Sequence, residues 1–286
     1  MDGRVRSIEE TLIRADDAGF QLGLSVFDTV LYENGCFYFI ERHLERLQRG
    51  ALELSINCPA ESEAIRALKM LRDAIGTESM ALRMTLTRGP AGAAPTFIIT
   101  AREISRPADP GAVLAIANDR RIGGDPMGRI KSTNRLLYIL AREDAIRRGA
   151  FEALFLSHDG DVLEGSISNF FCVVNGELMT PSVERGCLPG TVRGLLLDAL
   201  EREPVKVDGR ELSVRSDCVS EADLALATEI FLTNTTGRVI PVRELLEVDG
   251  QSRSLPGSNG PVTRVLRDLV ERLEAEYRAA QQKNGI

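Results

Sequence analysis

The stretch Gly128–Asp144, GRIKSTNRLLYILARED, leads from a glycine-rich segment into a run with helical periodicity. The apolar side chains that predict this helix by their spacing are Leu136, Leu137, Leu140 and Ala141. Lys131 stands at the expected entry of the helix, where the positive end of the helix dipole disfavours a cation. Lys131 is therefore either a solvated surface residue or an amine that works in its neutral form, and the other motifs of the chain have to distinguish the two.

The composition is that of a globular protein that can bury a full core. The chain has 286 residues, 43% of them hydrophobic, which favours two domains. Its net charge of −7 disfavours a nucleic-acid partner, because binding to a phosphate backbone needs a basic surface. No apolar run approaches the roughly 20 residues of a membrane span. The first residues lack the apolar core of a signal peptide, so we expect a cytoplasmic protein with no membrane partner.

Cysteine and histidine usage disfavours cross-links and metal sites. The five cysteines are scattered without a CxxC pair, as in proteins with reduced thiols. The two histidines, His43 and His158, are too few for a His-rich metal site, so we expect no metal. A Ser-His-Asp triad would have to use one of them, but His43 lies among charged residues and His158 in a turn.

The order of the predicted elements indicates a mixed α/β protein of the α+β type. Two β-rich runs flank Glu33-Asn34-Gly35, a hairpin signal, and two helical runs and two further β-rich runs follow. Such grouping, without strict alternation of strands and helices, is typical of α+β folds. We predict an N-terminal domain over residues 1–118, an interdomain loop over 119–128 and a C-terminal domain over 129–286. The last helix is expected to fray after about Tyr277.

Three places carry donors suited to an anion. In CLPGTVRG, Gly190 and Thr191 begin a predicted helix, and the free N–H groups of a helix start form an anion site. In FLTNTTGRV, Asn234 and Thr235 follow a buried strand. Arg46, in the predicted helix HLERLQRG, can supply the counter-charge. Each feature alone also fits a helix cap, a turn or a surface ion pair, and none resembles a nucleotide-binding glycine loop.

Glu164 lies at the end of a predicted strand, in VLEGSISNFF, and small residues follow it. A carboxylate is costly to bury unless a partner pairs with it. Glu164 is therefore either a turn residue that faces water or a carboxylate that holds the proton of a heteroaromatic nitrogen.

Taken together, these motifs resemble the class IV pyridoxal-phosphate aminotransferases, a group that contains D-amino acid aminotransferases, branched-chain aminotransferases and aminodeoxychorismate lyase. The resemblance extends from about Asp17 to Arg267. The motifs that carry it, in the order of the family, are GLSVFDTV…HLERL, IKSTNRL, EGSISNFF, LPGTVR and TNTTGRVIPV. Each motif alone is weak, but all of them in order are highly specific.

The resemblance implies a two-domain fold type IV enzyme, with pyridoxal 5′-phosphate in the cleft between the domains, that forms a homodimer. It implies that Lys131 binds the cofactor aldehyde and later moves a proton as a free amine. Glu164 would keep the pyridine nitrogen protonated, and Arg121 would lie near the phenolic oxygen. The residues implied to bind the cofactor phosphate are Arg46, Gly190, Thr191, Asn234 and Thr235.

Within the family, the KSTNRLLYILA run most resembles D-amino acid aminotransferases. We therefore expect a transaminase that acts on a D-amino acid and a 2-oxo acid such as 2-oxoglutarate or pyruvate. The alternatives are the lyase, which shares K-x-x-N-R-L, and a branched-chain L-amino acid aminotransferase, although the glycines and tyrosine that follow the lysine in those enzymes are missing. A catalytically silent anion-binding relative is the alternative that is no enzyme.

The sequence departs from the D-amino acid pattern at the substrate carboxylate. Phe27 replaces a tyrosine of those enzymes, and no Arg-x-His follows Gly89. A substrate carboxylate in a partly dry site needs another cation. Arg238 is the first candidate, unless it faces solvent or pairs with Glu244. The alternatives are Arg88 and Arg83.

Overall fold

The computed structural model describes residues 3–7, 9–10, 13–76 and 79–283, and its contacts divide the chain into two compact units. The first unit comprises Met1–Ile104, Ile130–Asn134 and Tyr277–Ile286, and the second comprises Ser105–Arg129 and Arg135–Glu276. These boundaries differ from the expected ones at residues 118 and 129. Strand β5 (Ala112–Ile116) pairs with strands of the second unit, and Arg121, within the expected interdomain loop, forms a β-bridge with Ser157.

The first unit is built on a four-stranded antiparallel sheet with the order β2-β1-β3-β4. Its strands are β1 (Ser25–Glu33), β2 (Cys36–Phe37), β3 (Met80–Thr87) and β4 (Phe97–Arg102). The predicted hairpin is confirmed, since Asn34 and Gly35 join β1 to β2 with φ of 54° and 78°. Both angles lie in the left-handed region that a tight hairpin turn requires, which asparagine and glycine tolerate best.

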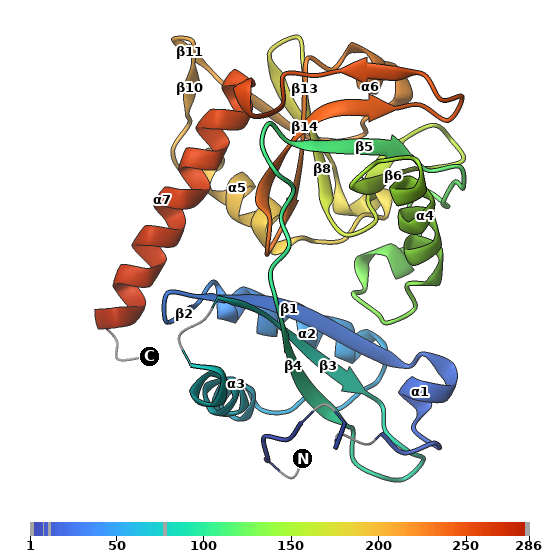
Figure 1. Cartoon of the computed structure of the whole chain (residues 1–286), viewed down its shortest axis with the longest axis vertical. Helices are drawn as coiled ribbons and strands as arrows, with labels where there is room; N and C mark the ends of the chain where they lie inside the picture. The colour runs from blue at the N-terminus through green and yellow to red at the C-terminus, as the bar shows by residue number, and fades with distance from the viewer. Residues whose placement is uncertain (1–2, 8, 11–12, 77–78, 284–286) are drawn as a thin grey trace. The chain divides into compact units, whose positions relative to one another are not determined.

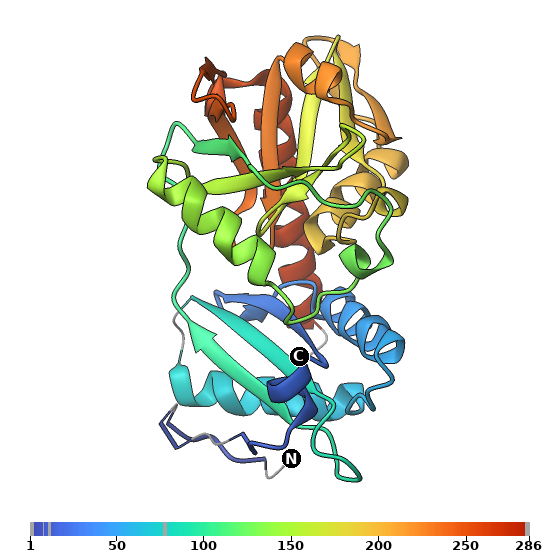
Figure 2. The ribbon, with the colours of Figure 1, turned by 90° about the vertical axis from the view of Figure 1, so that its right-hand side faces the viewer.

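Two helices cover one face of this sheet (Figures 1 and 2). The helices of the first unit are α1 (Ala18–Leu22), α2 (Ile40–Glu53) and α3 (Glu61–Ile75), and the two predicted ones, α2 and α3, are confirmed. Alternate residues of β1 and β3 point to the same face, as the strand period of two requires. The core formed there includes Val26, Val30, Leu82, Met84, Leu44, Leu47, Ala64 and Leu68.

The second unit contains a nine-stranded mixed sheet with the order β12-β9-β8-β13-β14-β5-β6-β7, and β15 pairs with β14. A further pairing of β7 with β8 closes six of these strands into a ring. The strands besides β5 are β6 (Glu152–Leu156), β7 (Val162–Gly165), β8 (Asn169–Val174), β9 (Glu177–Pro181), β12 (Ser213–Asp217), β13 (Glu229–Asn234), β14 (Arg238–Leu246) and β15 (Ser252–Ser254). A separate hairpin comprises β10 (Lys206–Val207) and β11 (Arg210–Glu211).

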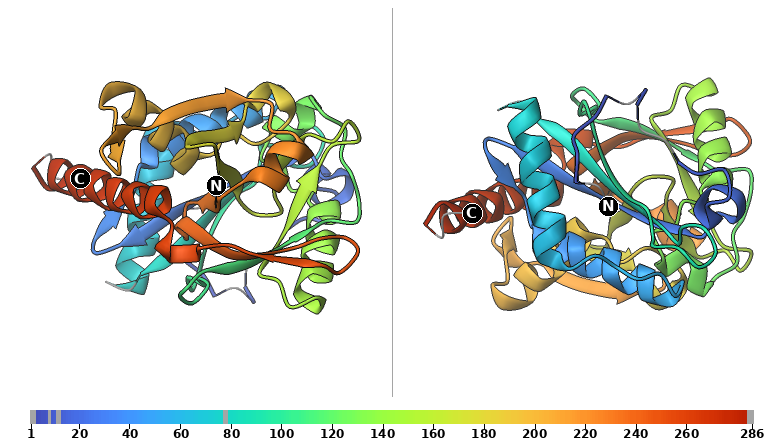
Figure 3. Two further views of the ribbon diagram at one scale, coloured as in Figure 1. Left: turned by 90° about the horizontal axis from the view of Figure 1, so that it is seen from above. Right: turned by 90° about the horizontal axis from the view of Figure 1, so that it is seen from below.

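Alternate residues along the strands of the ring belong to different hydrophobic clusters. One cluster includes Leu114, Leu154, Phe170 and Ile230. Their chain neighbours, such as Phe171 and Phe231, pack with helices on the other face. The helices are α4 (Leu136–Arg147), α5 (Thr191–Arg202), α6 (Glu221–Leu226) and α7 (Pro261–Lys283), with 3₁₀ turns at Pro126–Arg129, Val183–Arg185 and Gly257–Asn259. Figure 3 shows α4 and the first part of α7 on different sides of this sheet.

The end of α7 differs from the prediction that it frays after Tyr277. The helix continues through Lys283, and the Tyr277 hydroxyl donates a hydrogen bond to Glu41 Oε2 at 2.7 Å. The Tyr277 ring also lies 4.7 Å from the ring of Phe39. These contacts fix the last turns of α7 on the first unit. Within the described part of the chain, no helix is both long and apolar enough to cross a bilayer.

Candidate active site

Lys131 lies in an extended segment that runs beside β1. The Phe27 N–H donates to Lys131 O at 2.8 Å, and the Thr133 N–H donates to Ser25 O at 3.1 Å. The hydroxyls of Ser25 and Thr133 are also hydrogen-bonded to each other. Helix α4 begins only at Leu136, so the expectation that Lys131 stands at a helix entry was wrong. The pairing with β1 keeps Lys131 extended, and Lys131 is not part of the first turn of α4.

The half-buried Lys131 side chain lies near an aromatic ring. Its Nζ is 4.8 Å from the ring centroid of Phe27, and the Arg83 guanidinium carbon is 3.6 Å from the same centroid. The Lys131 amine and the Arg83 guanidinium therefore lie near the same ring, whose negative face attracts the guanidinium. The structure thus brings together Lys131, Phe27 and one of the alternative carboxylate-binding arginines.

Arg46 belongs to a buried cluster with Asp28 and His43. Asp28 Oδ2 accepts from Arg46 Nε at 2.8 Å, and Asp28 Oδ1 accepts from Arg46 Nη2 at 2.8 Å. His43 Nδ1 lies 2.7 Å from Asp28 Oδ1, and all three side chains are at most 7% exposed. Helix α2 places His43 and Arg46 one turn apart, so both reach the strand residue Asp28.

In this cluster, burial and ion pairing have opposite effects on the pKa values of Asp28 and His43. Burial would raise the pKa of the Asp28 carboxyl, but the charge of Arg46 and the hydrogen bonds from Arg46 and His43 hold it well below its ordinary value. Burial lowers the pKa of His43 more than Asp28 raises it, so the imidazole is neutral and donates from Nδ1. Asp28 thus holds two N–H groups of Arg46, which orients the guanidinium.

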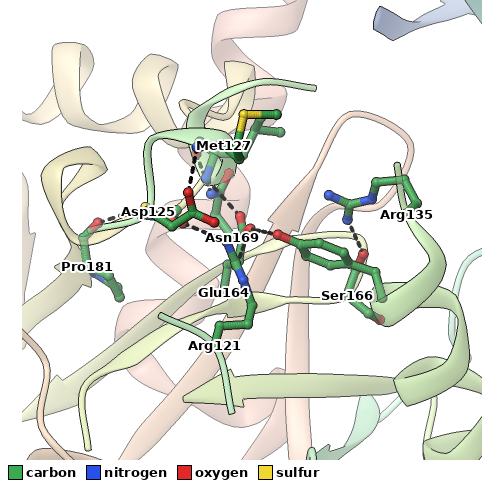
Figure 4. A network of polar contacts seen from close by, with 12 residues as sticks. Arg121, Asp125, Met127, Arg135, Glu164, Ser166, Asn169 and Pro181 are labelled. Carbon is green, nitrogen blue, oxygen red and sulfur yellow. Dashed lines mark hydrogen bonds and ion pairs between the residues drawn. The ribbon is translucent and has the colours of Figure 1, made fainter. Parts of the chain in front are cut away.

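In the second unit, Glu164 is the centre of a buried polar network (Figure 4). Its Oε1 accepts from Arg121 Nη1 at 2.9 Å and from the Tyr138 hydroxyl at 3.1 Å. Its Oε2 accepts from the Leu188 N–H at 2.8 Å. Glu164 is 3% exposed, which contradicts the alternative of a turn residue in water. The carboxylate is instead buried with a cation and two further donors.

Tyr138 and Arg135 are site residues that the sequence analysis did not assign. The Arg135 guanidinium carbon lies 3.3 Å from the Tyr138 ring centroid, and its Nη2 donates to Ser166 O at 2.6 Å. Burial, followed by the charge of Glu164, raises the pKa of Tyr138, so the phenol stays protonated and donates. The signal available in the sequence was their position after the IKSTN motif, with Arg135 at the N-cap of α4 and Tyr138 in its first turn.

The two predicted phosphate loops, around Gly190 and Asn234, meet where β8 begins and β13 ends. Asn169 Nδ2 donates to Leu188 O at 2.7 Å, and an added Cβ on Gly190 would lie 1.7 Å from Asn169 Oδ1. Asn169 is also the register partner of Thr233, the residue before Asn234. The start of α5, with Gly190 and Thr191, therefore lies beside the end of β13. Only glycine allows this close approach.

The turn after β13 is held by its own side chain. Asn234 Oδ1 accepts from the Gly237 N–H at 2.7 Å and from the Thr236 hydroxyl at 3.3 Å. Thr235 is half-buried in the same turn. Asn234 thus shapes the loop through its side chain, as asparagine does in turns.

Arg238 and Arg88, two candidates for the substrate carboxylate, are hydrogen-bonded to other residues of the chain. Arg238 Nε donates to both carboxylate oxygens of Glu274, at 2.8 and 2.7 Å, instead of pairing with Glu244. The exposed Arg88 donates to Leu54 O. Glu274 on α7 compensates the charge of Arg238, which weakens the expectation that Arg238 binds the substrate carboxylate.

The residues present fit pyridoxal phosphate by their chemistry. The chain offers a lysine amine, a buried carboxylate and, at the start of α5, a helix whose cap Gly190 has no side chain to occupy the first N–H groups. Two buried hydroxyls, Ser166 Oγ and Thr233 Oγ1, have no hydrogen-bond partner among the described residues. Each lies within two residues of Glu164 or Asn234 and can bind a polar ligand.

Comparisons with known proteins agree with this chemistry. The sequence model for amino-transferase class IV matches residues 25–245. The D-alanine aminotransferase of Bacillus licheniformis is 29% identical over 283 residues, with 94% of each chain covered. The PLP-bound form of a hypothetical aminotransferase from Mycobacterium tuberculosis has a TM-score of 0.82 at 25% identity, with 96% of this chain and 97% of that chain covered.

A lyase is similar to the same extent. The 4-amino-4-deoxychorismate lyase from Pseudomonas aeruginosa has a TM-score of 0.77 at 30% identity, and the match covers 95% of this chain and 97% of that chain. The similarities thus extend over nearly the whole chain. The chain belongs to the class IV aminotransferases, which are pyridoxal-phosphate-dependent enzymes of mixed α/β fold.

Proposed function

We propose that the chain is a transaminase that moves an amino group between a D-amino acid and a 2-oxo acid such as 2-oxoglutarate or pyruvate. The observation that carries the proposal is the Glu164 carboxylate, which is buried and held by Arg121, Tyr138 and the Leu188 N–H. A carboxylate can accept a hydrogen bond from a protonated pyridine nitrogen, which favours the protonated form of the ring. The preference for a D-amino acid rests on the KSTNRLLYILA run and on the similarity to a D-alanine aminotransferase.

Pyridoxal phosphate, when bound, supplies an electron-withdrawing ring that stabilises negative charge at the substrate Cα. In our proposal Lys131 would hold the cofactor through its aldehyde and, as a free amine, would move the proton at the substrate Cα. Glu164 holds the proton on the pyridine nitrogen. The residues proposed to bind the phosphate are Arg46, Gly190, Thr191, Asn234 and Thr235.

For the substrate carboxylate we favour Arg83 over Arg238 and Arg88. Arg83 shares the Phe27 ring with Lys131, and its Nε donates to the Thr85 hydroxyl at 3.3 Å. Arg238 is instead paired with the Glu274 carboxylate, and the exposed Arg88 donates to Leu54 O. We expect Arg83→Gln to raise the amino-acid concentration that half-saturates the reaction by about tenfold or more, as for loss of a charged hydrogen bond. Arg238→Gln should leave that concentration unchanged, and the opposite pattern would return Arg238 to the substrate.

The test of the function is a panel of D- and L-amino acids mixed with the pyridoxal-phosphate-loaded protein. Loss of the cofactor's visible absorbance and formation of the matching 2-oxo acid should occur with D-amino acids. Lys131→Ala should abolish both signals, whereas Lys206→Ala, an exposed lysine on β10, should not. Full turnover in Lys131→Ala would refute the assignment of the lysine.

Aminodeoxychorismate lyase is the second candidate, favoured by the K-x-x-N-R-L run and by the 30% identity to the Pseudomonas aeruginosa lyase. The two activities differ in their need for an acceptor. A lyase releases pyruvate from aminodeoxychorismate without any 2-oxo acid, whereas a transaminase stops after one turnover until a 2-oxo acid is added. A branched-chain L-amino acid aminotransferase would instead respond to the L-amino acids of the panel.

We also propose that the protein forms a homodimer. Helix α4 exposes five large apolar side chains. Soluble proteins seldom leave so much apolar surface in contact with water, and a protein partner usually covers it. They are Leu136, Leu137, Ile139, Leu140 and Ile146, which are 38–69% exposed. Light scattering should give twice the chain mass of 31.3 kDa, and Leu136→Glu with Leu140→Glu should give the single mass. We also propose that the protein is cytoplasmic, and cell fractionation tests this location.

A further inference from the structure

Glu152, on β6, is a fully buried carboxylate that none of the roles proposed above uses. Its Oε1 accepts from the Ile167 N–H at 2.6 Å and from the Ser168 hydroxyl at 2.9 Å. Its Oε2 has no hydrogen-bond partner among the described residues. A buried carboxylate of this kind is costly, so its retention in the core needs an explanation.

Both donors belong to the short segment that joins Glu164 to Asn169. Within it, the Gly165 N–H donates to Ser168 O at 2.8 Å, and the Ser166 N–H donates to Ala153 O, beside Glu152, at 2.9 Å. An added Cβ on Gly165 would lie 2.3 Å from Glu152 Oε1. The segment 165–168 is therefore folded directly onto the Glu152 carboxylate, and this fold needs a glycine at position 165.

This segment determines where Glu164 and Asn169 lie. The two residues are register partners at the point where β7 pairs with β8, and the residues between them are Gly165, which ends β7, and the bend 166–168. Glu164 accepts from the Leu188 N–H, and Asn169 donates to Leu188 O. A shift of the turn would therefore move the carboxylate and the anchor of the Gly190 loop together.

Protonation of Glu152 would weaken its hold on the segment. Burial raises the pKa of Glu152 to about 7, and the hydrogen bonds from Ile167 and Ser168 and the charge of Arg142 offset burial only in part. Arg142, on α4, is the charged group that acts on it. A charged acceptor forms hydrogen bonds about twice as strong as a neutral one, so the turn is held more firmly above this pH than below it.

We propose that Glu152 is a positioning residue for the active site: by binding Ile167 N–H and the Ser168 hydroxyl, it fixes the turn 165–168 and thereby orients Glu164. The inference rests on the proposed role of Glu164 at the pyridine nitrogen. Glu152 acts through the turn and does not touch substrate or cofactor.

The test compares Glu152→Gln with Glu229→Gln. Glu229 is a matched buried carboxylate of the same unit, which accepts from the Val262 and Thr263 N–H groups at the start of α7. Hydrogen–deuterium exchange of the cofactor-free protein at pH 8 should be about tenfold or more faster at Ile167 in Glu152→Gln, and unchanged there in Glu229→Gln. After correction for intrinsic exchange, the wild type should approach the Glu152→Gln rate as the pH falls to 6, whereas the rate in Glu152→Gln should not depend on pH.

The consequence for the active site is measured separately, by titrating the cofactor-free protein with pyridoxal phosphate and by steady-state kinetics. Glu152→Gln should weaken cofactor binding severalfold and lower kcat about tenfold, with less than a twofold change in the KM for the amino acid. Unchanged exchange at Ile167, or an equal change in Glu229→Gln, would overturn the proposal. If Glu152→Gln fails to fold, Ser168→Ala removes one of the two donors, and the same result at Ile167 is then required of it.

Different experiments would refute the positioning role of Glu152 and the proposed role of Glu164. If Glu164→Gln binds pyridoxal phosphate and turns over like the wild type, the role of Glu164 is wrong. The exchange result at Ile167 is obtained without cofactor and would be unaffected by that outcome. Fast exchange in Glu152→Gln with unchanged cofactor binding and kcat would limit Glu152 to stabilising the turn and would refute the positioning role.

Discussion

Replacing Asp28 by asparagine should destabilise the first unit. The size of the effect can be worked out from the contacts of Asp28 with Arg46 and His43. Asp28 is fully buried and is the acceptor for two N–H groups of Arg46 and one of His43. Removing one partner of a buried ion pair costs about 3–5 kcal/mol, because the other charge stays in the core without compensation. Asparagine retains one acceptor oxygen, so we expect the free energy of unfolding to fall by an amount near the lower end of this range, about 3 kcal/mol.

Urea unfolding of the cofactor-free protein measures this loss without any contribution from ligand binding. The chain has no tryptophan, and three of its four tyrosines, Tyr32, Tyr38 and Tyr277, belong to the first unit, so tyrosine fluorescence reports mainly on that unit. At a slope of roughly 2–3 kcal/mol per molar urea, a loss of about 3 kcal/mol lowers the midpoint by about 1–1.5 M. Asp16→Asn, which breaks an exposed pair with Arg14, should leave the midpoint unchanged.

The pH dependence gives an independent check of the same reasoning. Because the pKa of Asp28 in the folded protein lies below its ordinary value of 3.8, its stabilising contribution is fully present above that value and is lost as the pH falls further. The difference between wild type and Asp28→Asn should thus be constant between pH 5 and 8. Arg46→Met in the Asp28→Asn background should recover part of the loss, since it removes the uncompensated cation. A loss below about 1 kcal/mol, or purely additive effects in the double variant, would refute the account.

Three further variants test other parts of the site. Glu164→Gln should keep the fold but lower kcat about a hundredfold, because a neutral amide holds the pyridine proton less firmly; wild-type kinetics would exclude the role. Gly190→Ala should weaken pyridoxal-phosphate binding at least tenfold, since its Cβ would lie 1.7 Å from Asn169 Oδ1; unchanged binding would mean that the loop can shift freely. Arg46→Ala should raise the dissociation constant of pyridoxal phosphate about ten- to a hundredfold, as for loss of a charged contact, and an unchanged constant in a titration would restrict Arg46 to its pair with Asp28.

Local sequence patterns predicted the elements whose stabilising contacts are local. The Asn34-Gly35 hairpin and helix α2 follow from turn chemistry and helical spacing, and the structure confirms both. The order of the motifs also singled out Glu164, which the structure buries beside Arg121, while its role at the pyridine nitrogen stays a prediction. For the hairpin and α2 the information lies within a few residues of the feature, whereas Glu164 is buried by distant residues such as Arg121.

Features made by distant pairings escaped prediction. Lys131 is extended because its backbone pairs with Phe27, over a hundred residues earlier, and no pattern in IKSTN signals that partner. Arg238 binds Glu274 across 36 residues, so a loop arginine that fitted a substrate role has a structural partner instead. Glu152 was overlooked for the same reason, because only the folded turn shows that its carboxylate lies beneath Gly165.

The course of the backbone around Lys131 also limits how this protein can be divided. Five residues, Ile130–Asn134, belong to the first unit, although Arg129 before them and Arg135 after them belong to the second. Neither unit is therefore one continuous piece of chain, and a gene fragment that ends at Ile104 encodes a β1 without the segment that carries Lys131. A chimera that exchanges residues 1–104 with a relative would pair a foreign β1 with the native lysine segment. Recombination can preserve this pairing only if the exchanged β1 also accepts Ile130–Asn134, so the two stretches are expected to be inherited together.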